Sequence, residues 1–141
     1  MVNTQNKDRI TNIVSDMEKY LSEIAGMRIT KESLNDKMRF YAASMLLFSL
    51  INRSIDLGEE ILSAFKLGMP STYKDVFYIL GREKLIGRET ERAMSNLVRY
   101  RNLLSHEYSG ITADNIIEAM KEIGGIEMFL HDMKKAAKRM V

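Results

Sequence analysis

The chain has 141 residues, of which 45% are hydrophobic and 28% are charged, a balance typical of one folded domain with a single core and not of a disordered chain. It contains no cysteine, which excludes disulfide bonds and thiolate metal sites. Its formal net charge of +2 is too small for a protein that binds nucleic acid over its whole surface.

The N-terminal segment MVNTQNKDRI lacks the apolar core of a signal peptide. The longest apolar run, residues 41–51, contains two serines and is about half as long as a membrane span. We therefore expect a cytoplasmic protein that forms a single domain over residues 1–141 and does not enter a membrane.

Apolar residues recur at spacings of three and four along most of the chain, and no segment alternates as a strand would. The sequence therefore predicts an all-α fold, an up-and-down bundle of about four to five helices with one long central helix. The first helix is expected over residues 8–24, with Gly26 ending it. The second is expected over residues 31–67, capped by Thr30 or Ser33, and would be about 55 Å long.

This long second helix has two apolar faces. Asn52 and Glu59 interrupt the first face, a heptad-like seam made by Leu34, Met38, Tyr41, Met45, Phe48, Ile55 and Leu62. The second face is made by Ala43, Leu46, Leu47, Leu50 and Ile61. A helix buried on two sides needs partners on both, which suggests that its outer face binds another subunit.

Three shorter helical segments follow. Thr72 and Asp75 have the spacing of a capping box at the start of a short helix that extends to Glu83, and a fourth helix is expected over residues 88–106. Thr112 is a candidate cap for a fifth helix. Gly124 and Gly125 are expected to kink or divide that last helix.

The segment RNLLSHEY, from Arg101 to Tyr108, combines the residue types that RNA cleavage requires without a metal ion. Arg101 can grip two phosphate oxygens at once, and His106 can accept or donate a proton near neutral pH. Asn102 and His106 are four positions apart and so lie on one side of a helix. Many helices match R-x-x-x-x-H by chance, so the spacing alone leaves open a solvated arginine and a packing histidine.

The segment resembles the R-x-x-x-x-H-x-Y motif of HEPN-domain proteins, specifically the toxins of HEPN/MNT toxin–antitoxin pairs (the HepT-like family). The stretch RFYAASMLLFSLINRSIDLGEEI looks like the long helix of that family, and MPSTYKDVFYILGREKLI resembles its connector and short helix. The resemblance covers residues 37–111. Ser105 is more polar than the aliphatic residue expected before the histidine, at a position outside the chemistry.

The resemblance implies a homodimeric, metal-independent endoribonuclease that needs no cofactor and binds no DNA. Arg101 would stabilise the phosphorane, His106 would act as general acid/base, and Asn102 would orient the imidazole or the phosphate. A nucleotidyltransferase antitoxin of the MNT type would adenylylate Tyr108, and the added AMP would block or repel substrate phosphate. The alternative for Tyr108 is that it packs the helix end against the core.

Other polar residues have two interpretations each. Asp56 and Glu59 could orient Arg101 or His106 from beneath the site; alternatively they form a solvated end of the seam or pair with Arg53. Lys134, Lys135, Lys138 and Arg139 could be a solvated helix end, or they could guide RNA or touch the antitoxin.

His131 has no basic or nucleophilic neighbour in sequence and is expected to be structural, and no spacing of histidines and carboxylates predicts a metal site.

The alternative function is a catalytically inactive HEPN module that binds nucleotide or docks onto a nucleotidyltransferase. A third is a dimeric helical scaffold without a ligand.

Overall fold

The computed structural model describes residues 4–106 and 110–140. Within these ranges it contains six α-helices, one short 3₁₀ turn and no β-strand. The elements are α1 (Thr4–Gly26), η1 (Ser33–Asn35), α2 (Lys37–Ala64), α3 (Tyr73–Arg82), α4 (Arg88–His106), α5 (Ala113–Met120) and α6 (Ile123–Ala137). The predicted all-α bundle with one long central helix is confirmed.

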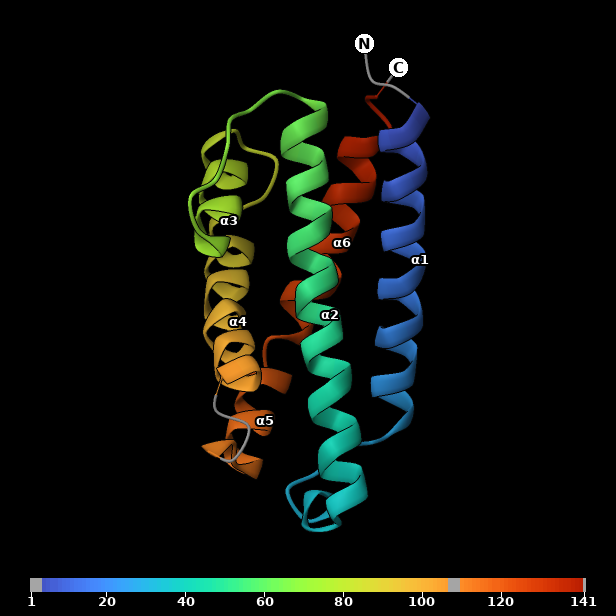
Figure 1. Cartoon of the computed structure of the whole chain (residues 1–141), viewed down its shortest axis with the longest axis vertical. Helices are drawn as coiled ribbons and strands as arrows, with labels where there is room; N and C mark the ends of the chain where they lie inside the picture. Colours follow the sequence, from blue (N-terminus) through green and yellow to red (C-terminus); the bar gives the residue numbers. More distant parts are fainter. Residues whose placement is uncertain (1–3, 107–109, 141) are drawn as a thin grey trace.

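Helix α2 stands at the centre of the bundle. It contacts α1, α3, α4, α5 and α6, and Figure 1 shows α1 and α4 on its two sides with α6 behind. The short helices α3 and α5 lie near the upper and lower parts of α4, and the start of α1 lies close to the end of α6 at one end of the bundle (Figure 1). This arrangement brings α2, α3 and α4 together around one surface.

One continuous apolar core joins the helices. Phe77 of α3 and Phe129 of α6 meet edge to face, with ring centroids 5.3 Å apart, and burial of each large apolar side chain contributes roughly 1.5–3 kcal/mol. The largest fully buried side chains include Met17, Leu47, Leu50, Ile51, Leu57, Ile61, Leu80 and Met94. None of the described helices combines the length and the hydropathy that a crossing of the bilayer requires.

Helix α2 starts later and ends earlier than the predicted range of 31–67. Its cap is Asp36, whose carboxylate accepts a hydrogen bond from the Met38 amide at 3.1 Å. Thr30 and Ser33 instead bond to each other, the Ser33 amide donating to Thr30 Oγ1 at 3.1 Å, so they close a turn before the helix. Lys66 ends α2 because it takes a left-handed conformation at φ 54°. The helix therefore has 28 residues and a length of about 42 Å.

The last predicted helix is divided, but not at its glycines. The break falls at residues 121–122, and both Gly124 and Gly125 lie inside α6. A Cβ atom on Gly125 would come within 2.5 Å of the Ala93 Cβ. The glycine therefore permits α6 to approach α4 closely and does not break the helix.

The first part of the α2 seam is exposed and its second part is buried. Met38, Tyr41 and Met45 keep 80%, 53% and 51% of their surfaces accessible. Ile55 and Leu62 are almost fully buried. Leu34, which precedes α2, is also buried. The bundle of one chain therefore leaves an apolar surface over the N-terminal half of α2 itself.

Candidate functional site

Helix α4 carries the arginine and histidine of the motif and ends at His106, as predicted. Two glutamates in its first turn suit the positive end of the helix dipole. The side chain of His106 and the whole of Tyr108 lie outside the described residues. The roles of these two residues therefore remain predictions, and the geometry of the site is built from Arg101 and Asn102.

Arg101 reaches from α4 to α2 and is held there by an amide. Its Nε–H donates to Oδ1 of Asn52 at 2.8 Å, and its Nη1 donates to Oδ1 of Asn102 at 3.4 Å. Within the described part of the chain, Nη2 of Arg101 makes no hydrogen bond. One edge of the guanidinium fork is thus anchored while the other edge keeps donors for an incoming acceptor.

Two aromatic rings fix the plane of this guanidinium. Its central carbon lies 4.7 Å from the ring centroid of Tyr73 and 5.6 Å from that of Phe48. Contacts of this kind attract a cation to the face of a ring, at roughly 0.5–1 kcal/mol when exposed. Arg101 is therefore positioned by four side chains, two from α2, one from α3 and one, Asn102, from α4 itself.

The local sequence explains why Tyr73 is available for this contact. Thr72 caps α3 by accepting from the Asp75 amide at 3.2 Å, and Asp75 in return accepts from the Thr72 amide at 3.1 Å. This confirms the predicted capping box and fixes Tyr73 as the first residue of α3. Gly58 of α2 allows α3 to pack closely, because a Cβ there would lie 2.5 Å from Val76 Cγ1.

The charge of Arg101 is not neutralised by a carboxylate among the residues that the structure describes. Its partners are the amides of Asn52 and Asn102, which are neutral. By contrast, several other cations of the chain form ion pairs, among them Arg9 with Glu60 and Lys134 with Glu18. Arg101 therefore presents a full positive charge in a fixed orientation.

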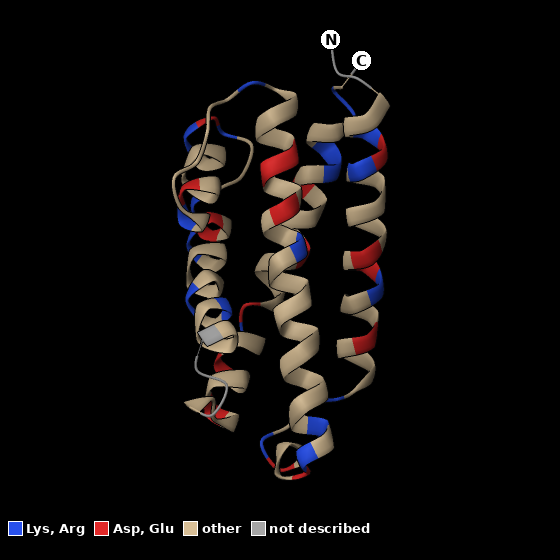
Figure 2. Ribbon diagram, viewed as in Figure 1, with Lys and Arg blue, Asp and Glu red and all other residues tan. Residues whose placement is uncertain are grey.

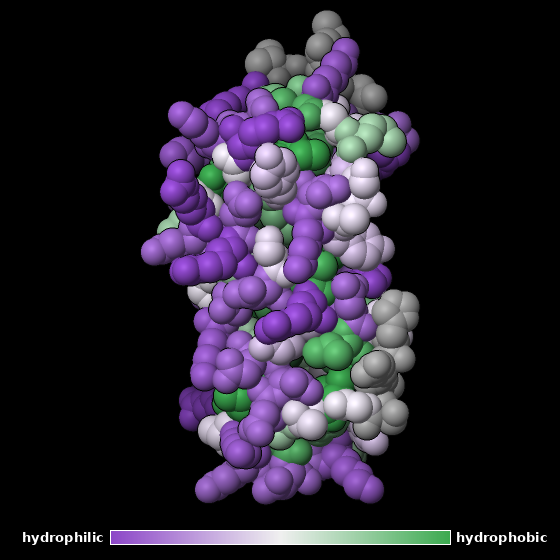
Figure 3. Space-filling view, turned by 90° about the vertical axis from the view of Figure 1, so that its left-hand side faces the viewer, coloured by the Kyte–Doolittle hydropathy of each residue, from purple (hydrophilic) through white to green (hydrophobic). Residues whose placement is uncertain are grey.

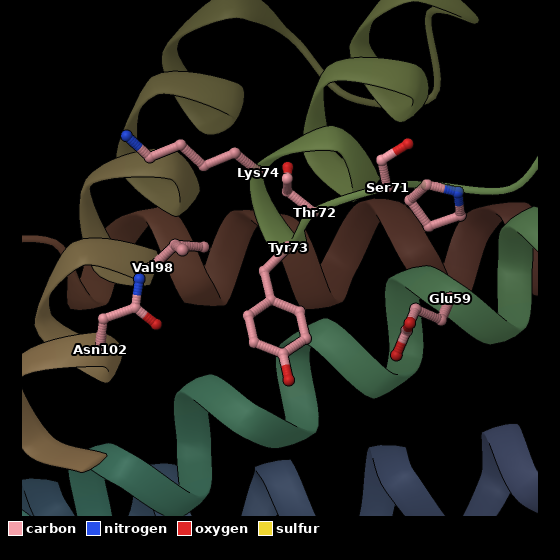
Figure 4. A pocket seen from close by; sticks show the side chains of 8 residues that line it. Glu59, Ser71, Thr72, Tyr73, Lys74, Val98 and Asn102 are labelled. Atoms are coloured by element: carbon pink, nitrogen blue, oxygen red, sulfur yellow. The ribbon is translucent and has the colours of Figure 1, made fainter. Parts of the chain in front are cut away.

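A hollow of about 510 Å³ lies beside this arginine. Figure 4 shows that its walls come from three helices and from the connector before α3, with Glu59 on α2, Tyr73 on α3, and Val98 and Asn102 on α4. Lys74 also borders the hollow. A ligand in this space would contact Asn102 and Tyr73, both of which also contact Arg101.

Asp56 pairs with Arg53, which was one of the two alternatives for this residue. Arg53 Nη1 lies 3.0 Å from Asp56 Oδ2, and Arg53 Nη2 lies 2.8 Å from Asp16 Oδ2. The hydrogen bond with Asp16, followed by that with Asp56, raises the pKa of Arg53 despite the opposing effect of burial. Neither Asp56 nor Glu59 bonds to Arg101 within residues 4–106 and 110–140.

Glu59 borders the hollow on the opposite side from Asn102 (Figure 4). Burial of its carboxyl group, followed by the nearby charges of Asp56 and Glu60, raises the pKa of Glu59. A carboxylate here adds negative charge to the rim and does not serve as a partner of the arginine.

Sequence reasoning singled out Asn52 only as a polar interruption of an apolar seam, and it assigned no role to Tyr73 or Phe48. Asn52 and Arg101 are separated by 49 positions, so only helix packing brings them together. An amide on a buried seam needs a partner, and that need was the one signal in the sequence that pointed to this contact.

The remaining candidates lie elsewhere. His131 is exposed on α6 and borders a shallow hollow with Lys134, Lys135 and Lys138. Among the described residues, no group of three or more His, Asp or Glu side chains is placed to hold a metal ion.

Comparison with known proteins gives one family and several similar structures. The family model described as "Ribonuclease HepT-like" matches residues 12–139. A crystal structure of a toxin–antitoxin with AMP-PNP aligns with a TM-score of 0.83 at 19% identity, covering 91% of this chain and 98% of that one. No curated protein sequence matches the chain.

Two further structures share the fold. A tri-AMPylated HEPN toxin of Shewanella oneidensis, in complex with MNT antitoxin, aligns with a TM-score of 0.82 at 20% identity, covering 91% of this chain and 98% of that one. YutE of Bacillus subtilis, a cytosolic protein of unknown function, aligns with a TM-score of 0.77 at 20% identity, covering 98% of this chain and 90% of that one.

Proposed function

We propose that this chain, which belongs to the Ribonuclease HepT-like family, is the toxin of a HEPN/MNT toxin–antitoxin pair and cleaves RNA without a metal ion. The observation that carries the proposal is the state of Arg101, which is held by Asn52 and Tyr73 but paired with no carboxylate among the described residues. A cation that is fixed and not neutralised is suited to binding the phosphate at which a strand is cut.

The chemistry follows from the charges that develop during cleavage. The 2′-oxygen of a ribose loses its proton and attacks the adjacent phosphorus, which gives a phosphorane with an additional negative charge. The bond to the 5′-oxygen then breaks, and that oxygen gains a proton, leaving a 2′,3′-cyclic phosphate and a 5′-hydroxyl. Arg101 would stabilise the phosphorane through the donors that Asn52 does not use.

His106 is proposed as the general acid/base, because an imidazole titrates near neutral pH. Asn102 would orient the phosphate or the imidazole from its place on the rim of the hollow. Two copies of His106, one from each subunit of a homodimer, could divide the removal and the return of the proton.

The exposed part of α2 supports the homodimer. Met38, Tyr41 and Met45 form an apolar surface on one side of the helix, and Phe48, which contacts Arg101, continues the same spacing. A second copy that covered this surface would bring its own Arg101 close to the first. Molar mass in solution, for the chain and for a Tyr41→Lys variant, tests this: a monomeric wild-type chain would contradict it.

Regulation is proposed to act through Tyr108. A structural neighbour is a tri-AMPylated HEPN toxin in complex with MNT antitoxin, which supports adenylylation by a nucleotidyltransferase partner. AMP attached near Arg101 would add bulk and negative charge where substrate phosphate binds. Another neighbour is described as cytosolic, which supports the cytoplasm as the compartment where both partners meet RNA.

The alternative function is a catalytically inactive HEPN module that binds nucleotide or docks onto a nucleotidyltransferase. The hollow beside Arg101, with an aromatic ring and polar rim, is the feature that favours it. It predicts nucleotide binding without RNA cleavage.

The deciding experiment is RNA cleavage by purified protein in the presence of EDTA. We expect products with 2′,3′-cyclic phosphate and 5′-hydroxyl ends, and loss of activity in Arg101→Ala and His106→Ala. Arg39→Ala is a matched control, because Arg39 is an exposed arginine of α2 paired with Asp36 at 3.7 Å. Wild-type protein that binds nucleotide but leaves RNA intact would favour the alternative.

Adenylylation is tested separately by co-expression with the neighbouring nucleotidyltransferase. Intact mass and peptide mapping should place AMP on Tyr108, with none on a Tyr108→Phe variant. Unmodified Tyr108 in toxin that the partner nevertheless neutralises would contradict this part of the proposal.

A further inference from the structure

The outer side of α4 carries a straight row of polar residues, of which only Asn102 has a part in the chemistry above. Going along the helix from its first residue, Arg88, Arg92, Ser95, Arg99 and Asn102 follow one another at spacings of four, three, four and three. Each residue turns an α-helix by about 100°, so this spacing keeps all five on one side. We call this row the arginine stripe, and position 106 continues it by the next step of four.

The arginine stripe faces away from the core. Met94, Leu97 and Leu104 of α4 are buried, and they lie on the opposite side of the helix. The three arginines of the stripe and Asn102 are exposed, and Ser95 is half-buried. Figure 3, which views the molecule from the side of α3 and α4, shows a surface dominated by hydrophilic side chains.

Within the part of the chain that the structure describes, the positive charges of the stripe have no ion-pair partners. Among the residues that the structure describes, neither Arg88 nor Arg92 nor Arg99 forms an ion pair, whereas cations on α1, α2, α3 and α6 do. The acidic residues of α4 stand only in its first turn, and residues 92–106 contain none. Figure 2 shows basic positions at several levels along α4.

At its first turn the stripe borders a second hollow, of about 530 Å³. Arg88 shares this hollow with Lys84, Lys135 and Arg139, and with the carboxylates of Glu91 and Asp132. The basic surface therefore extends from the C-terminal part of α6 onto α4 and then along α4 to Asn102, on the rim of the hollow beside Arg101.

We infer that the arginine stripe is a binding track for the sugar-phosphate backbone of single-stranded RNA, which it leads to the site at Asn102 and Arg101. The inference rests on the proposed function. From position 88 to position 106 the track is about 27 Å long, enough for roughly eight phosphates of a stacked strand at about 3.4 Å each. Unpaired arginines in one line complement a line of phosphates. This track adds local charge to a chain whose net charge is small.

The test measures binding and cleavage separately. The binding probe is a labelled single strand of about twelve nucleotides of 2′-O-methyl RNA, longer than the roughly eight phosphates of the track and unable to be cut because its 2′-oxygens are blocked. Fluorescence anisotropy gives its affinity for the full chain between about 50 and 200 mM salt. Arg92→Gln/Arg99→Gln removes two cations of the stripe and keeps side-chain length and helix propensity.

The matched control is Lys7→Gln/Lys19→Gln. These lysines are exposed on α1, on the other side of the bundle in Figure 1, and their loss changes the net charge by the same amount. For the stripe variant we expect the plot of log affinity against log salt to become less steep by about 1.4, and the affinity at 0.1 M salt to fall on the order of 20-fold. The control should behave like the wild type, and both variants should keep the wild-type melting temperature.

The track is overturned if the stripe variant keeps the wild-type salt slope, if the control changes as much, or if the wild type does not bind the probe. It is also overturned if the stripe variant retains RNA binding but loses affinity for the nucleotidyltransferase, because the stripe would then be a protein-docking surface. A wild type that binds the probe through the stripe but leaves ordinary RNA intact would refute the proposed ribonuclease and support the track.

Discussion

Arg53, which belongs to α2, and Arg101, which reaches α2 from α4, differ in the groups that surround their charge. Arg53 is bound by two carboxylates, with Asp16 at 2.8 Å and Asp56 at 3.0 Å. Arg101 is bound by the neutral amide of Asn52, at 2.8 Å, and lies against two aromatic rings. Asn52 and Arg53 are adjacent in the chain, so the two environments lie on neighbouring sides of one helix.

The comparison shows that being held in place and being neutralised are separate properties. Arg53 links α1 to α2, and its charge is neutralised by carboxylates of the same chain. Arg101 is also fixed by hydrogen bonding and ring contacts, but no carboxylate among the described residues pairs with it. An arginine of the second kind is expected to matter for ligand binding and little for stability.

The largest expected difference is in the rate of RNA cleavage, between the variants in which one or the other arginine is exchanged for alanine. Arg101→Ala should lower the rate of RNA cleavage by about 10²- to 10³-fold, as expected when a group that stabilises developing charge is lost. Arg53→Ala should leave the rate near that of the wild type. The measurement is kcat/KM on a labelled RNA substrate, with melting temperatures as a check on folding.

Equal losses of activity in these two variants would break the comparison. So would an Arg101→Ala protein that is much less stable but, once folded, fully active.

A smaller effect is expected when the neutral partner of Arg101 is made acidic. Asn52→Asp keeps the shape of the side chain and gives a stronger, charge-assisted hydrogen bond, so stability should not fall. Cleavage should decrease by about tenfold, which corresponds to roughly 1.4 kcal/mol, because the new carboxylate offsets the charge that attracts phosphate. Unchanged cleavage by Asn52→Asp would mean that the neutrality of this partner does not matter.

Removing a carboxylate from Arg53 should affect stability alone. Asp16→Asn is expected to lower the free energy of unfolding by about 0.5–1 kcal/mol, since both side chains are more than one-third exposed and water screens such pairs. Urea unfolding gives this quantity. A decrease in RNA cleavage by the same variant, at a temperature where it is folded, would contradict the assignment of Arg53 to structure.

The smallest effect concerns Glu59 and depends on pH. Because the folded chain raises the pKa of Glu59 above its ordinary value of 4.5, its ionisation disfavours the folded state at neutral pH, and this penalty disappears as the pH falls below that value. Glu59→Gln should therefore stabilise the chain at pH 7, by less than about 0.5 kcal/mol, but not near pH 4. An equal gain at both pH values would show that charge is not the cause.

Much of the fold followed from signals that are local in the sequence. Thr72 with Asp75 predicted the start of α3 and Thr112 predicted the start of α5, because a cap involves residues within one helical turn of each other. Helix α1 ends at Gly26 as predicted, but the left-handed residue that follows the helix is Arg28. Helix α4 was predicted over its observed range of 88–106 from the spacing of its apolar residues. The start of α2 was predicted wrongly, since Thr30, Ser33 and Asp36 are all good caps and only the folded chain selects Asp36.

The sequence by itself determined which residue types the candidate site combines, through the order of Arg101, Asn102 and His106 along α4. The tertiary structure alone decided that Asn52 and Tyr73 hold Arg101, while Asp16 and Asp56 bind Arg53. The reason is physical: a helix places its own side chains by a fixed rise and rotation, whereas the partner across a helix–helix contact depends on how two separate helices pack. Whether an arginine is neutralised is decided across that contact.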